Sequence, residues 1–395
     1  MNILTINCGS STLKFELFEA AERERSIARG VVDSIGGRGS AEFSSESGDK
    51  LVEPTATADH GEAALNAIQL LDTSALLGGL EAVGHRVVHG GARFSGPVLL
   101  DARAEESIEE LAEFAPLHNG PALAAISAVR EILGPEIPQV AAFDTAFHSL
   151  MPRVARLFAL PRHLADEGLM RYGFHGLSYE YVMGELRALD PEAAAGRVLI
   201  AHLGNGASMV AVRGGVGVDT TMGFTPAGGL VMGTRSGDLD PGVLLYLLEK
   251  KELSPPEIGE LINRGAGLLG ISETTADMRE LLSREANDPR AAEALALFCY
   301  QAKKFLGALA TVLGGLDTLV FSGGIGEHAA TVRWRICESL EFLGVELDAR
   351  RNAEHAPVIS RDDRPVTVRV IPTDENLMIA RHTRRLVRAK SKEGA

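Results

Sequence analysis

The 395-residue sequence has few cysteines, few aromatic residues and no long uninterrupted apolar run. Its three cysteines are an odd number at no metal-ligand spacing, which argues against a disulfide framework and indicates reduced thiols in a cytoplasm. The longest apolar stretch, 293–316, is interrupted by lysines and glycines well short of a membrane span. Asn2, Asn7 and the Gly-Ser pair that follows interrupt any apolar signal segment, so we expect no signal peptide.

Basic residues are also in the minority, with 39 Lys and Arg against 53 Asp and Glu and a formal net charge of −14. This acidic balance argues against general binding to nucleic acids or membranes. The one basic run, RHTRRLVRAKSK at 381–392, is short and lacks interleaved aromatic residues, so we interpret it as a solvated helix end. We therefore expect a cytoplasmic protein with no nucleic-acid partner and no membrane partner.

The composition is that of a globular protein, 45% hydrophobic and 23% charged, and the chain is long enough for two domains. Strand-like runs alternate with helical ones, which indicates an α/β fold. Residues 1–18 are expected to form two strands around a tight turn, and 48–71 a strand followed by an amphipathic helix. Residues 81–91 are expected to form a buried strand ending in glycines, and 138–148 a strand with Asp144 at its end. Residues 106–133 are expected to form two helices broken at Pro116 and at Gly120-Pro121.

Three glycine-containing turns follow apolar strands. NCGSSTLKF (7–15) and HLGNGAS (202–208) each join two strands, which predicts an internal duplication with roughly 200 residues between the copies. SGGIGEH (322–328) instead leads from a strand into a helix. Glycine amides, hydroxyls and Lys14 can bind phosphate, and a helix N-terminus favours it further. A hairpin turn with exposed serines is the alternative for the first turn alone, whereas the three turns together favour a nucleotide. None of them is a Walker loop or a dinucleotide fingerprint.

Two arginines occupy unusual positions. Arg86 lies between apolar residues in GHRVVHGG, and Arg235 lies in the glycine-rich MGTRSGDLDPG. A planar guanidinium matches the oxygens of a carboxylate or a phosphate. The alternative for each arginine is an internal salt bridge, for instance to Asp144 or Asp238.

Histidines and carboxylates complete the candidate set. The histidines in glycine-rich contexts are His85, His89, His118, His175 and His202. Functional residues are frequent in such irregular backbone. The alternative for each histidine is a structural role with a hydrogen bond. No pair of them has the spacing of a metal site. Asp144 and Glu375 could hold Mg²⁺ through one or two oxygens. For Glu375 the alternative is a carboxylate at a helix N-terminus.

The motifs occur in one order from residue 3 to about residue 381, nearly the whole chain. They are NCGSSTLKF, GHRVVHGG, APLHN, FDTAFH, RYGFHG, HLGNGAS, DTTMGFTPAGGLVMGTRSGDLDPG, SGGIGE and PTDE. The ordered set closely resembles the acetate kinase family. The resemblance implies an α/β fold of two duplicated ribonuclease H-like (actin-like ATPase) domains around a central cleft, usually in a homodimer. The implied domains are 1–146 plus 377–395, and a nucleotide-binding domain at 147–376.

The implied activity is reversible, direct in-line phosphoryl transfer from ATP to acetate, giving ADP and acetyl phosphate, with Mg²⁺ as the metal and Mn²⁺ as a possible substitute. The alternatives are a propionate or butyrate kinase of the same superfamily, or a non-catalytic ATP-gated clamp. Acetate is already an anion at neutral pH and needs no general base, so we expect Asp144 to orient Mg²⁺ or an arginine. One CH₂ separates acetate from propionate, and Val88 fills space where a smaller residue would suit propionate.

Site residues carry over from the resemblance in four groups. Catalysis is implied for Asp144, Arg86, Arg235 and His175, with His118 in a lesser role. Binding of acetate is implied for Arg86, Val88, Leu117, Phe174 and Pro226. Nucleotide contacts are implied for Ser10, Thr12, Lys14, His202, Leu203, Gly204, Asn205, Gly206, Asp277, Met278, Arg279, Gly324, Ile325, Gly326, Glu327 and His328. The Mg²⁺ neighbourhood is implied for Asn7 and Glu375.

The sequence departs from the family pattern at a few positions. His328 stands where asparagine is usual, so adenine-side contacts are expected to differ. Gly120 replaces a proline and is expected to loosen a turn. Leu177 and Tyr179 replace the usual threonine and histidine, and Thr12 replaces a serine, one hydroxyl for another.

Overall fold

The computed structural model describes residues 1–9, 11–20 and 24–393, with the side chains of Pro116, Leu117 and Glu393 left aside. The chain divides into two compact units, unit 1 with Met1–Ser149 and Asp374–Ala395, and unit 2 with Leu150–Thr373. The division lies a few residues from the boundaries expected from the sequence, and it assigns Glu375 to unit 1. Each unit is described by itself.

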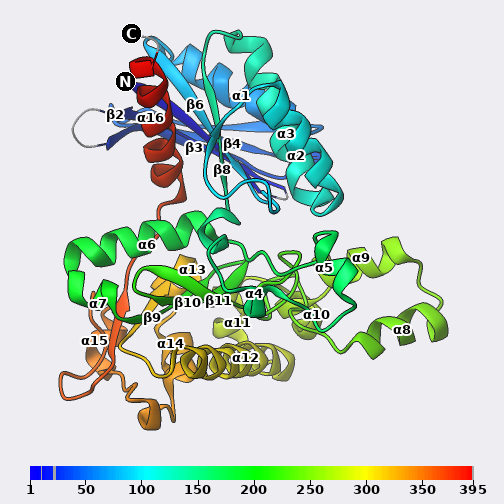
Figure 1. Ribbon diagram of the computed structural model, residues 1–395, viewed down its shortest axis with the longest axis vertical. Helices are drawn as coiled ribbons and strands as arrows, with labels where there is room; N and C mark the ends of the chain where they lie inside the picture. Colours follow the sequence, from blue (N-terminus) through cyan, green and yellow to red (C-terminus); the bar gives the residue numbers. More distant parts are fainter. Residues whose placement is uncertain (10, 21–23, 394–395) are drawn as a thin grey trace. The chain divides into compact units, whose positions relative to one another are not determined.

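Unit 1 contains an eight-stranded sheet in the order β5-β4-β3-β2-β1-β6-β8-β7, with helices on both faces (Figure 1). Its strands are β1 (Asn2–Cys8), β2 (Leu13–Ala20), β3 (Glu24–Val32), β4 (Gly37–Ser45), β5 (Lys50–Thr57), β6 (Leu80–Val87), β7 (Val98–Leu99) and β8 (Gln139–Phe143). Its helices are α1 (His60–Thr73), α2 (Ala102–Glu110), α3 (Pro116–Leu133) and α16 (Glu375–Glu393), with short 3₁₀ turns η1 (Leu111–Glu113) and η2 (Ala146–His148).

The strand period of two decides which side chains of β1 and β6 face α16. Ile3 of β1 packs with α16, whereas Leu4 and Ile6 pack with α1 and α3 on the other face. Asn7 therefore shares the α16 face. On β6, an added Cβ at Gly84 would lie 2.3 Å from the Thr383 hydroxyl of α16, so only glycine permits this close approach. Arg86, two residues further, lies on the same face as Gly84.

Helix α3 differs in part from the expectation. The break at Pro116 is confirmed, because η1 ends shortly before it and Pro116 starts α3. The break at Gly120-Pro121 is wrong, because α3 continues through both residues, and Gly120 lies in a helix and not in a loosened turn. Pro121 removes one backbone hydrogen bond early in the helix. Burial of Ala125 and Val129 against the sheet outweighs that local loss.

Unit 2 contains a five-stranded sheet in the order β11-β10-β9-β12-β13. Its strands are β9 (Arg197–Leu203), β10 (Ala207–Arg213), β11 (Val216–Thr220), β12 (Thr318–Ser322) and β13 (Thr367–Val370). Its helices are α4 (Arg153–Arg156), α5 (Arg162–Asp166), α6 (Gly176–Leu189), α7 (Pro191–Ala195), α8 (Pro241–Lys250), α9 (Pro255–Arg264), α10 (Gly267–Ser272), α11 (Met278–Arg284), α12 (Pro289–Leu313), α13 (Gly323–His328), α14 (Ala330–Cys337), η3 (Glu341–Leu343) and α15 (Ala349–Ala353).

The two sheets repeat one topology, which confirms the predicted duplication. In unit 1, β3, β2 and β1 are successively antiparallel, and β1, β6 and β8 are successively parallel. In unit 2, β11, β10 and β9 are antiparallel, and β9, β12 and β13 are parallel, in the same order. The turns 7–15 and 202–208 occupy corresponding places. This is the duplicated ribonuclease H-like fold.

The basic run at the C-terminus forms the later turns of α16 but is not simply solvated. Arg384 Nη2 lies 2.6 Å from Glu24 Oε1, and the Glu24 side chain is only 9% exposed. Arg381 contacts the same carboxylate, and His382 is buried. The prediction of a solvated end is wrong for this face, because α16 packs against the sheet. Within the described residues, no helix combines the length and apolar character that crossing a bilayer requires.

All three cysteines are free and buried, as the composition indicates. Burial raises the pKa of the Cys8 thiol to about 12 and that of the Cys299 thiol to about 11, and it raises the pKa of Cys337 as well. The thiolate is the reactive form, so very little of it exists at pH 8. We expect Ellman's reagent to leave the native protein unlabelled over minutes and to label all three thiols in guanidinium chloride. Rapid labelling of the native protein would contradict this burial.

Candidate functional site

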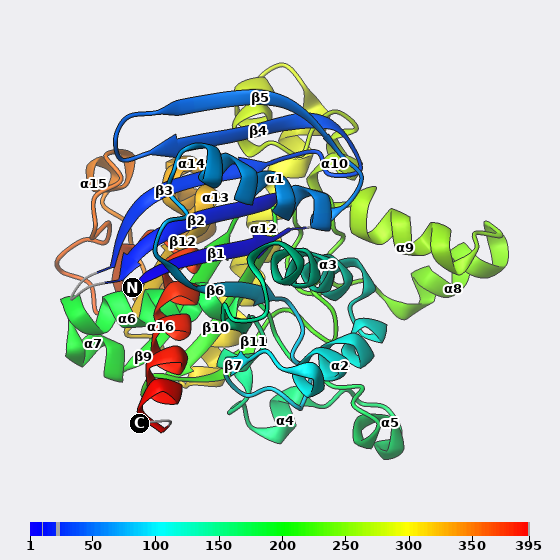
Figure 2. The ribbon, with the colours of Figure 1, turned by 90° about the horizontal axis from the view of Figure 1, so that it is seen from above.

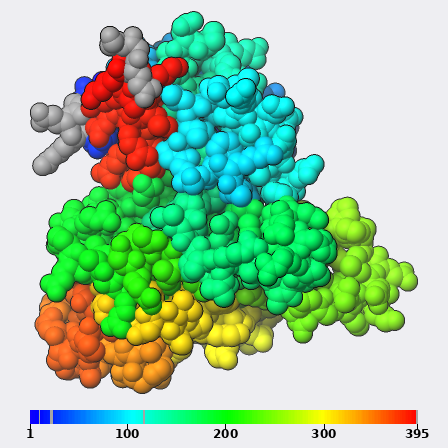
Figure 3. Space-filling view, viewed as in Figure 1, coloured from blue at the N-terminus to red at the C-terminus, as the bar shows by residue number. Residues whose placement is uncertain are grey.

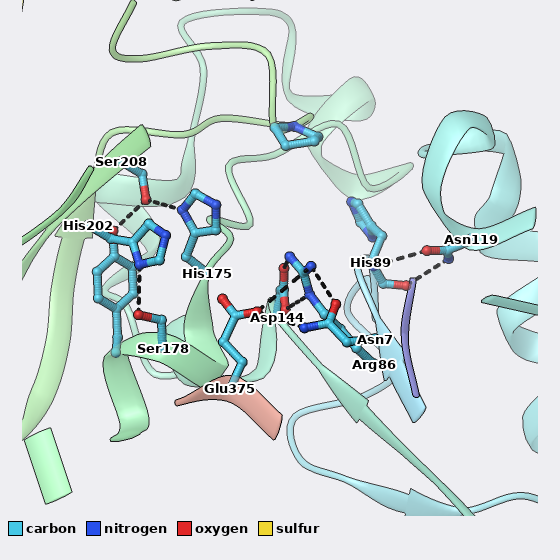
Figure 4. Close-up of polar contacts among 12 residues, drawn as sticks. Asn7, Arg86, His89, Asn119, Asp144, His175, Ser178, His202, Ser208 and Glu375 are labelled. Atoms are coloured by element: carbon cyan, nitrogen blue, oxygen red, sulfur yellow. Dashed lines mark hydrogen bonds and ion pairs between the residues drawn. The ribbon is translucent and has the colours of Figure 1, made fainter. Parts of the chain in front are cut away.

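Unit 1 gathers four polar residues at one edge of its sheet (Figure 4). Strands β1, β6 and β8 are parallel neighbours, and parallel strands end at the same edge. Asn7 lies near the end of β1, Arg86 near the end of β6, and Asp144 directly after β8. Glu375, the first residue of α16, joins them. Such an edge is where open α/β sheets bind ligands.

Arg86 and Asp144 form a buried two-point ion pair. Arg86 Nε donates to Asp144 Oδ1 at 2.9 Å, and Nη2 donates to Oδ2 at 2.6 Å. The Asp144 side chain is 1% exposed and that of Arg86 15% exposed. Burial alone would lower the pKa of Arg86, but the Asp144 and Glu375 carboxylates outweigh it and raise that pKa. The internal salt bridge that the sequence left open for Arg86 is therefore present.

The third nitrogen of Arg86 points toward the other two residues. Nη1 donates to Asn7 Oδ1 at 3.0 Å and lies 3.9 Å from Glu375 Oε2. Asn7 Nδ2 donates to the same Glu375 oxygen at 3.0 Å. The guanidinium is thus held by oxygen atoms from three separate segments, which fixes its position before any ligand arrives.

The donor set of this cluster fits Mg²⁺. Asn7, Asp144 and Glu375 contribute hard oxygen atoms, and Mg²⁺ commonly binds one or two carboxylates while keeping water and substrate phosphate oxygens. Among the described residues, no group of three or more His, Cys, Asp or Glu side chains forms a metal cage. Glu375 starts α16, as the alternative of a carboxylate at a helix N-terminus predicted, and it contacts Asn7. Its part in a Mg²⁺ site stays a prediction.

The first glycine turn is closed by its own backbone. The Gly9 N–H donates to the Thr12 carbonyl at 2.7 Å, and the Gly9 carbonyl lies 2.8 Å from His60 Nε2. The Gly9 amide is therefore engaged, and the predicted phosphate contacts must come from the later residues of the turn. Lys14 is exposed and pairs with Asn7 in the β1–β2 register. Ser10 lies outside the described residues.

In unit 2, two histidines lie with their rings stacked, 4.3 Å between centroids (Figure 4). His202 is near the end of β9, and its Nδ1 lies 2.8 Å from the Ser178 hydroxyl. Thr373 Oγ1 donates to Ser178 at 2.8 Å. Ser178 accepts that proton and still has one of its own, which it can donate to His202 Nδ1.

His175 has the corresponding arrangement. It precedes α6 with φ 59°, a left-handed conformation that non-glycine residues adopt at a cost of roughly 1–2 kcal/mol. Its Nδ1 lies 2.8 Å from the Ser208 hydroxyl, and that hydroxyl also bonds to the Tyr179 hydroxyl. Ser208 and Tyr179 are fully buried.

The loop after β9 lies against both histidines and Arg235. An added Cβ on Gly206 would lie 3.2 Å from His175 Nε2 and 3.7 Å from Arg235 Nη1. One on Gly204 would lie 3.8 Å from His202 Nε2. Asn205 anchors the loop, because its carbonyl accepts the Gly233 N–H at 2.9 Å. The structure therefore brings His175, His202, Arg235 and the loop 204–206 together in one cluster.

Arg235 is placed by uncharged groups. Its Nη1 donates to the Pro226 carbonyl at 3.1 Å and lies 3.7 Å from the Met232 sulfur. Asp238, the salt-bridge partner considered for it, instead accepts the Gly229 N–H at 2.7 Å.

The third glycine turn is itself helical. Helix α13 begins at Gly323, so the glycines form its first turn. The sequence predicted a glycine loop before the helix, and that prediction is wrong. Gly324 is exposed, with open space where a Cβ would stand. Glu327 Oε1 accepts the Thr373 N–H at 3.2 Å. The remaining members of the expected nucleotide segment are Ile325 and Gly326, which are part-buried and buried, and His328, which is exposed.

Arg333, from α14, holds the end of α13. It is fully buried, and its Nη1 donates to the carbonyls of Gly326 and Glu327 at 2.8 Å each. Its Nε donates to Asn352 Oδ1 at 2.9 Å. Burial lowers the pKa of Arg333 to about 10. A cation at a helix C-terminus stabilises the last carbonyls.

The expected adenosine-side segment has a local structural role. Asp277 is the N-cap of α11 and accepts the N–H groups of Arg279 at 2.8 Å and Glu280 at 3.1 Å. The Arg279 guanidinium, 91% exposed, also bonds to Asp277 and holds the pKa of that carboxyl below its usual range. Met278 is buried. Contact with a nucleotide stays a prediction for this segment.

The residues expected around the acetate methyl group belong to both units. Val88 is buried just after β6, and Phe174 is buried before α6. Pro226 presents its carbonyl to Arg235. His118 lies on the first turn of α3, while the side chain of Leu117 lies outside the described part.

The sequence analysis did not identify several residues that position the site. Asn119 bonds to both backbone groups of His89, at 3.0 and 2.9 Å, and so ties α3 to the end of β6 beside Val88. The others are Ser178, Ser208, Thr373 and Arg333, described above. Asn119, Ser208 and Thr373 lie inside motifs quoted from the sequence, which was the available signal, but their partners become visible only in three dimensions.

The fold places the chain in the class of duplicated ribonuclease H-like proteins. Comparison with known proteins is more specific, because the model of the Acetokinase family matches residues 2–381. Acetate kinase of Rhodopseudomonas palustris (strain ATCC BAA-98 / CGA009) is 47% identical over 393 residues, covering 97% of this chain and 98% of the relative. Acetate kinase of Clostridium beijerinckii is 42% identical over 402 residues, covering 98% and 100%. The chain belongs to the acetokinase family.

Solved structures agree in fold. The crystal structure of Porphyromonas gingivalis acetate kinase superposes with a TM-score of 0.89 at 38% identity, covering 98% of this chain and 99% of that one. A propionate kinase from Francisella tularensis subsp. tularensis SCHU S4 superposes with a TM-score of 0.92 at 37% identity and the same coverage. The fold is therefore shared by relatives named for two different acids.

The burial of the Arg86–Asp144 pair makes a stability prediction. Arg86→Met leaves the Asp144 carboxylate buried without its partner, so we expect the free energy of unfolding to fall by about 3–5 kcal/mol. The matched control is Arg25→Ala, which removes an exposed pair and should cost less than about 1 kcal/mol. Urea unfolding followed by far-UV circular dichroism is suitable, because the one tryptophan, Trp334, reports only on unit 2. Equal losses in the two variants would contradict the burial argument.

Proposed function

We propose that the protein transfers the terminal phosphoryl group of ATP to acetate, reversibly and in line, forming acetyl phosphate and ADP. Membership of the acetokinase family over residues 2–381 is the observation that carries this proposal. The arrangement of charged residues supports it. Acetate is an anion that needs no deprotonation, and the buried carboxylate Asp144 is committed to Arg86 and not placed as a lone proton acceptor.

Cations supply most of the proposed catalysis. The transferring phosphoryl group spreads negative charge over its equatorial oxygens, and it repels the acetate that attacks it. Arg86 binds the carboxylate and this group, and Arg235 stabilises the same charge. His175 donates from Nε2, beside Arg235. Preorganised donors of this kind lower the barrier because they need no rearrangement as the charge develops. His118 has a lesser, supporting role.

The nucleotide is proposed to bind unit 2 and the first turn of unit 1. Loop 202–206 and helix α13 contact its phosphates, Thr12 and Lys14 of unit 1 add further phosphate contacts, and segment 277–279 contacts the adenosine. Asn7 and Glu375 hold Mg²⁺, or Mn²⁺ in its place. When bound, the metal neutralises phosphate charge and orients its oxygens. The protein residues also position the acceptor, which adds to the electrostatic stabilisation.

Propionate is the second candidate substrate. The similarity to a propionate kinase supports it, and one CH₂ in an apolar pocket changes binding by only about 1–3 kcal/mol. Val88, buried beside His89, favours the smaller acid. We propose acetate as the preferred substrate and propionate as a slower one.

A homodimer is proposed as the assembly, with α8 at its interface. No residue of α8 is buried, although the helix carries several large apolar side chains. Figures 2 and 3 show α8 beside α9, standing out from the rest of unit 2. Val243, Leu245, Tyr246 and Leu248 are between 39% and 56% exposed. The sequence alone showed no such patch, and an exposed apolar helix of this kind is suited to contact with a second copy of the chain. We further propose that the enzyme works in the cytoplasm, where ATP and reduced thiols occur together.

Arg235→Ala tests the catalytic proposal. We expect turnover to fall by roughly two to three decades, the usual effect of losing a preorganised donor to a developing anion. Trapping acyl phosphate as hydroxamate measures the product directly. Arg350→Ala, which changes an exposed arginine of the same unit, serves as the control and should leave turnover unchanged. Near-normal turnover in Arg235→Ala would refute the role, and ATP hydrolysis without acyl phosphate in the unaltered protein would refute the proposed reaction.

Val88→Ala tests the substrate preference. Removing two methyl groups makes room for the extra CH₂ of propionate, so we expect propionate turnover relative to acetate to rise by roughly tenfold. Hydroxamate formation with acetate, propionate and butyrate measures the ratio. Val52→Ala, a change at an exposed valine of the same unit, is the matched control. An unchanged ratio in Val88→Ala would remove Val88 from the acid-binding pocket.

A further inference from the structure

We infer that Tyr179 is a positioning residue for phosphoryl transfer, acting through Ser208 to keep His175 in the tautomer that carries its proton on Nε2. This inference rests on the proposed role of His175 as a donor to the phosphoryl group. Tyr179 is one of the positions where the sequence departs from the family pattern. It lies on the first turn of α6, one turn from His175.

Ser208 sets the direction of the two hydrogen bonds. Its hydroxyl contacts His175 Nδ1 at 2.8 Å and the Tyr179 hydroxyl, and Ser208 is fully buried. A serine hydroxyl has one proton, so it donates one of these bonds and accepts the other. If both neighbours donated to it, its own proton would have to go unbonded in a buried site, which is costly.

The chemistry of the partners selects one direction. A phenol is a stronger hydrogen-bond donor than an alcohol, and an unprotonated imidazole nitrogen is a stronger acceptor than a phenol oxygen. Tyr179 therefore donates to Ser208, and Ser208 donates to His175 Nδ1. The single remaining ring proton of neutral His175 is then on Nε2, the atom that lies against the Gly206 backbone.

The neighbouring histidine, His202, has a similar pair of hydroxyl groups at its Nδ1. Thr373 donates to Ser178, which contacts His202 Nδ1. Each pair has one hydroxyl on α6, that of Ser178 or Tyr179, and each contacts a histidine of the stacked pair. Two hydroxyl pairs that leave two adjacent histidines as Nε2 donors indicate an arrangement built for a ligand that accepts hydrogen bonds.

A cation lies beside these two histidines. The rings of His175 and His202 stack 4.3 Å apart, and Arg235 Nη1 lies on the same side of the Gly206 backbone as His175 Nε2. A ligand that accepts a hydrogen bond from His175 Nε2 would therefore also lie near the Arg235 guanidinium, which suits an anion.

The first test reads the tautomer in the protein without substrate. Nitrogen-15 NMR of histidine-labelled protein, with the His175 signals assigned by their loss in His175→Gln, distinguishes protonated from unprotonated ring nitrogens. We expect an unprotonated Nδ1 and a protonated Nε2 in the unaltered protein, and a mixture of tautomers in Tyr179→Phe. A protonated Nδ1 in the unaltered protein would overturn the inference. This readout needs no turnover, so it is independent of whether acetate is the substrate.

The second test is kinetic. Tyr179→Phe should lower kcat roughly fivefold, the effect of losing one neutral hydrogen bond, with the KM values for ATP and acetate changed less than twofold. Ser208→Ala should lower kcat more, and the double variant should be no slower than Ser208→Ala, because Tyr179 acts only through Ser208. Additive losses in the double variant would overturn the inference, whatever the single values.

Two further variants separate positioning from packing. Tyr179→His restores a ring donor of the type usual in the family and should recover most of the kcat lost in Tyr179→Phe. Tyr172→Phe removes another phenol of unit 2, one that donates to the Gly168 carbonyl at 2.8 Å, and should leave kcat and the His175 tautomer unchanged. Failure of Tyr179→His to recover kcat, or an equal loss in Tyr172→Phe, would show that Tyr179 only fills space.

Discussion

The buried ion pair between Arg86 and Asp144 is the constraint on which the rest of the site in unit 1 depends. A guanidinium placed on an interior strand needs an anion, and β8 supplies one directly after its last residue. The pair leaves one nitrogen of Arg86 directed at Asn7 and Glu375. A cation is thereby fixed at the edge of the sheet without titrating, in a protein whose net charge would otherwise repel both substrates.

Unit 2 places two histidines beside a cation. His175 and His202 are oriented by hydroxyl groups, and Arg235 by a backbone carbonyl and a sulfur atom. The glycines of loop 204–206 let the backbone approach all three. The two units share a strand topology but carry different polar side chains at the corresponding sheet edges. The duplication therefore supplied two similar sheet edges, which now hold different functional groups.

The fold was largely predictable because its signals are local. Apolar strands ending in glycine turns identified β1, β9 and β12, and the repeated turn identified the duplication. The contacts at the sites were less predictable. The bond between Asn7 and Glu375 joins residues 368 positions apart, and no local pattern encodes it. The expectation that a proline breaks a helix was wrong at Pro121, where burial of α3 outweighs one lost hydrogen bond. The exposure of α8 was also not predictable, because its apolar sequence resembles that of a core helix.

Arg86 and Arg235 are proposed to act together on the phosphoryl group in transfer. A crystal structure with ADP, aluminium fluoride, Mg²⁺ and acetate tests it most directly, because the fluoride group imitates that phosphoryl. The account predicts a guanidinium nitrogen of each arginine within about 3 Å of a fluorine or acetate oxygen. A complex in which either guanidinium points away from both groups would contradict it.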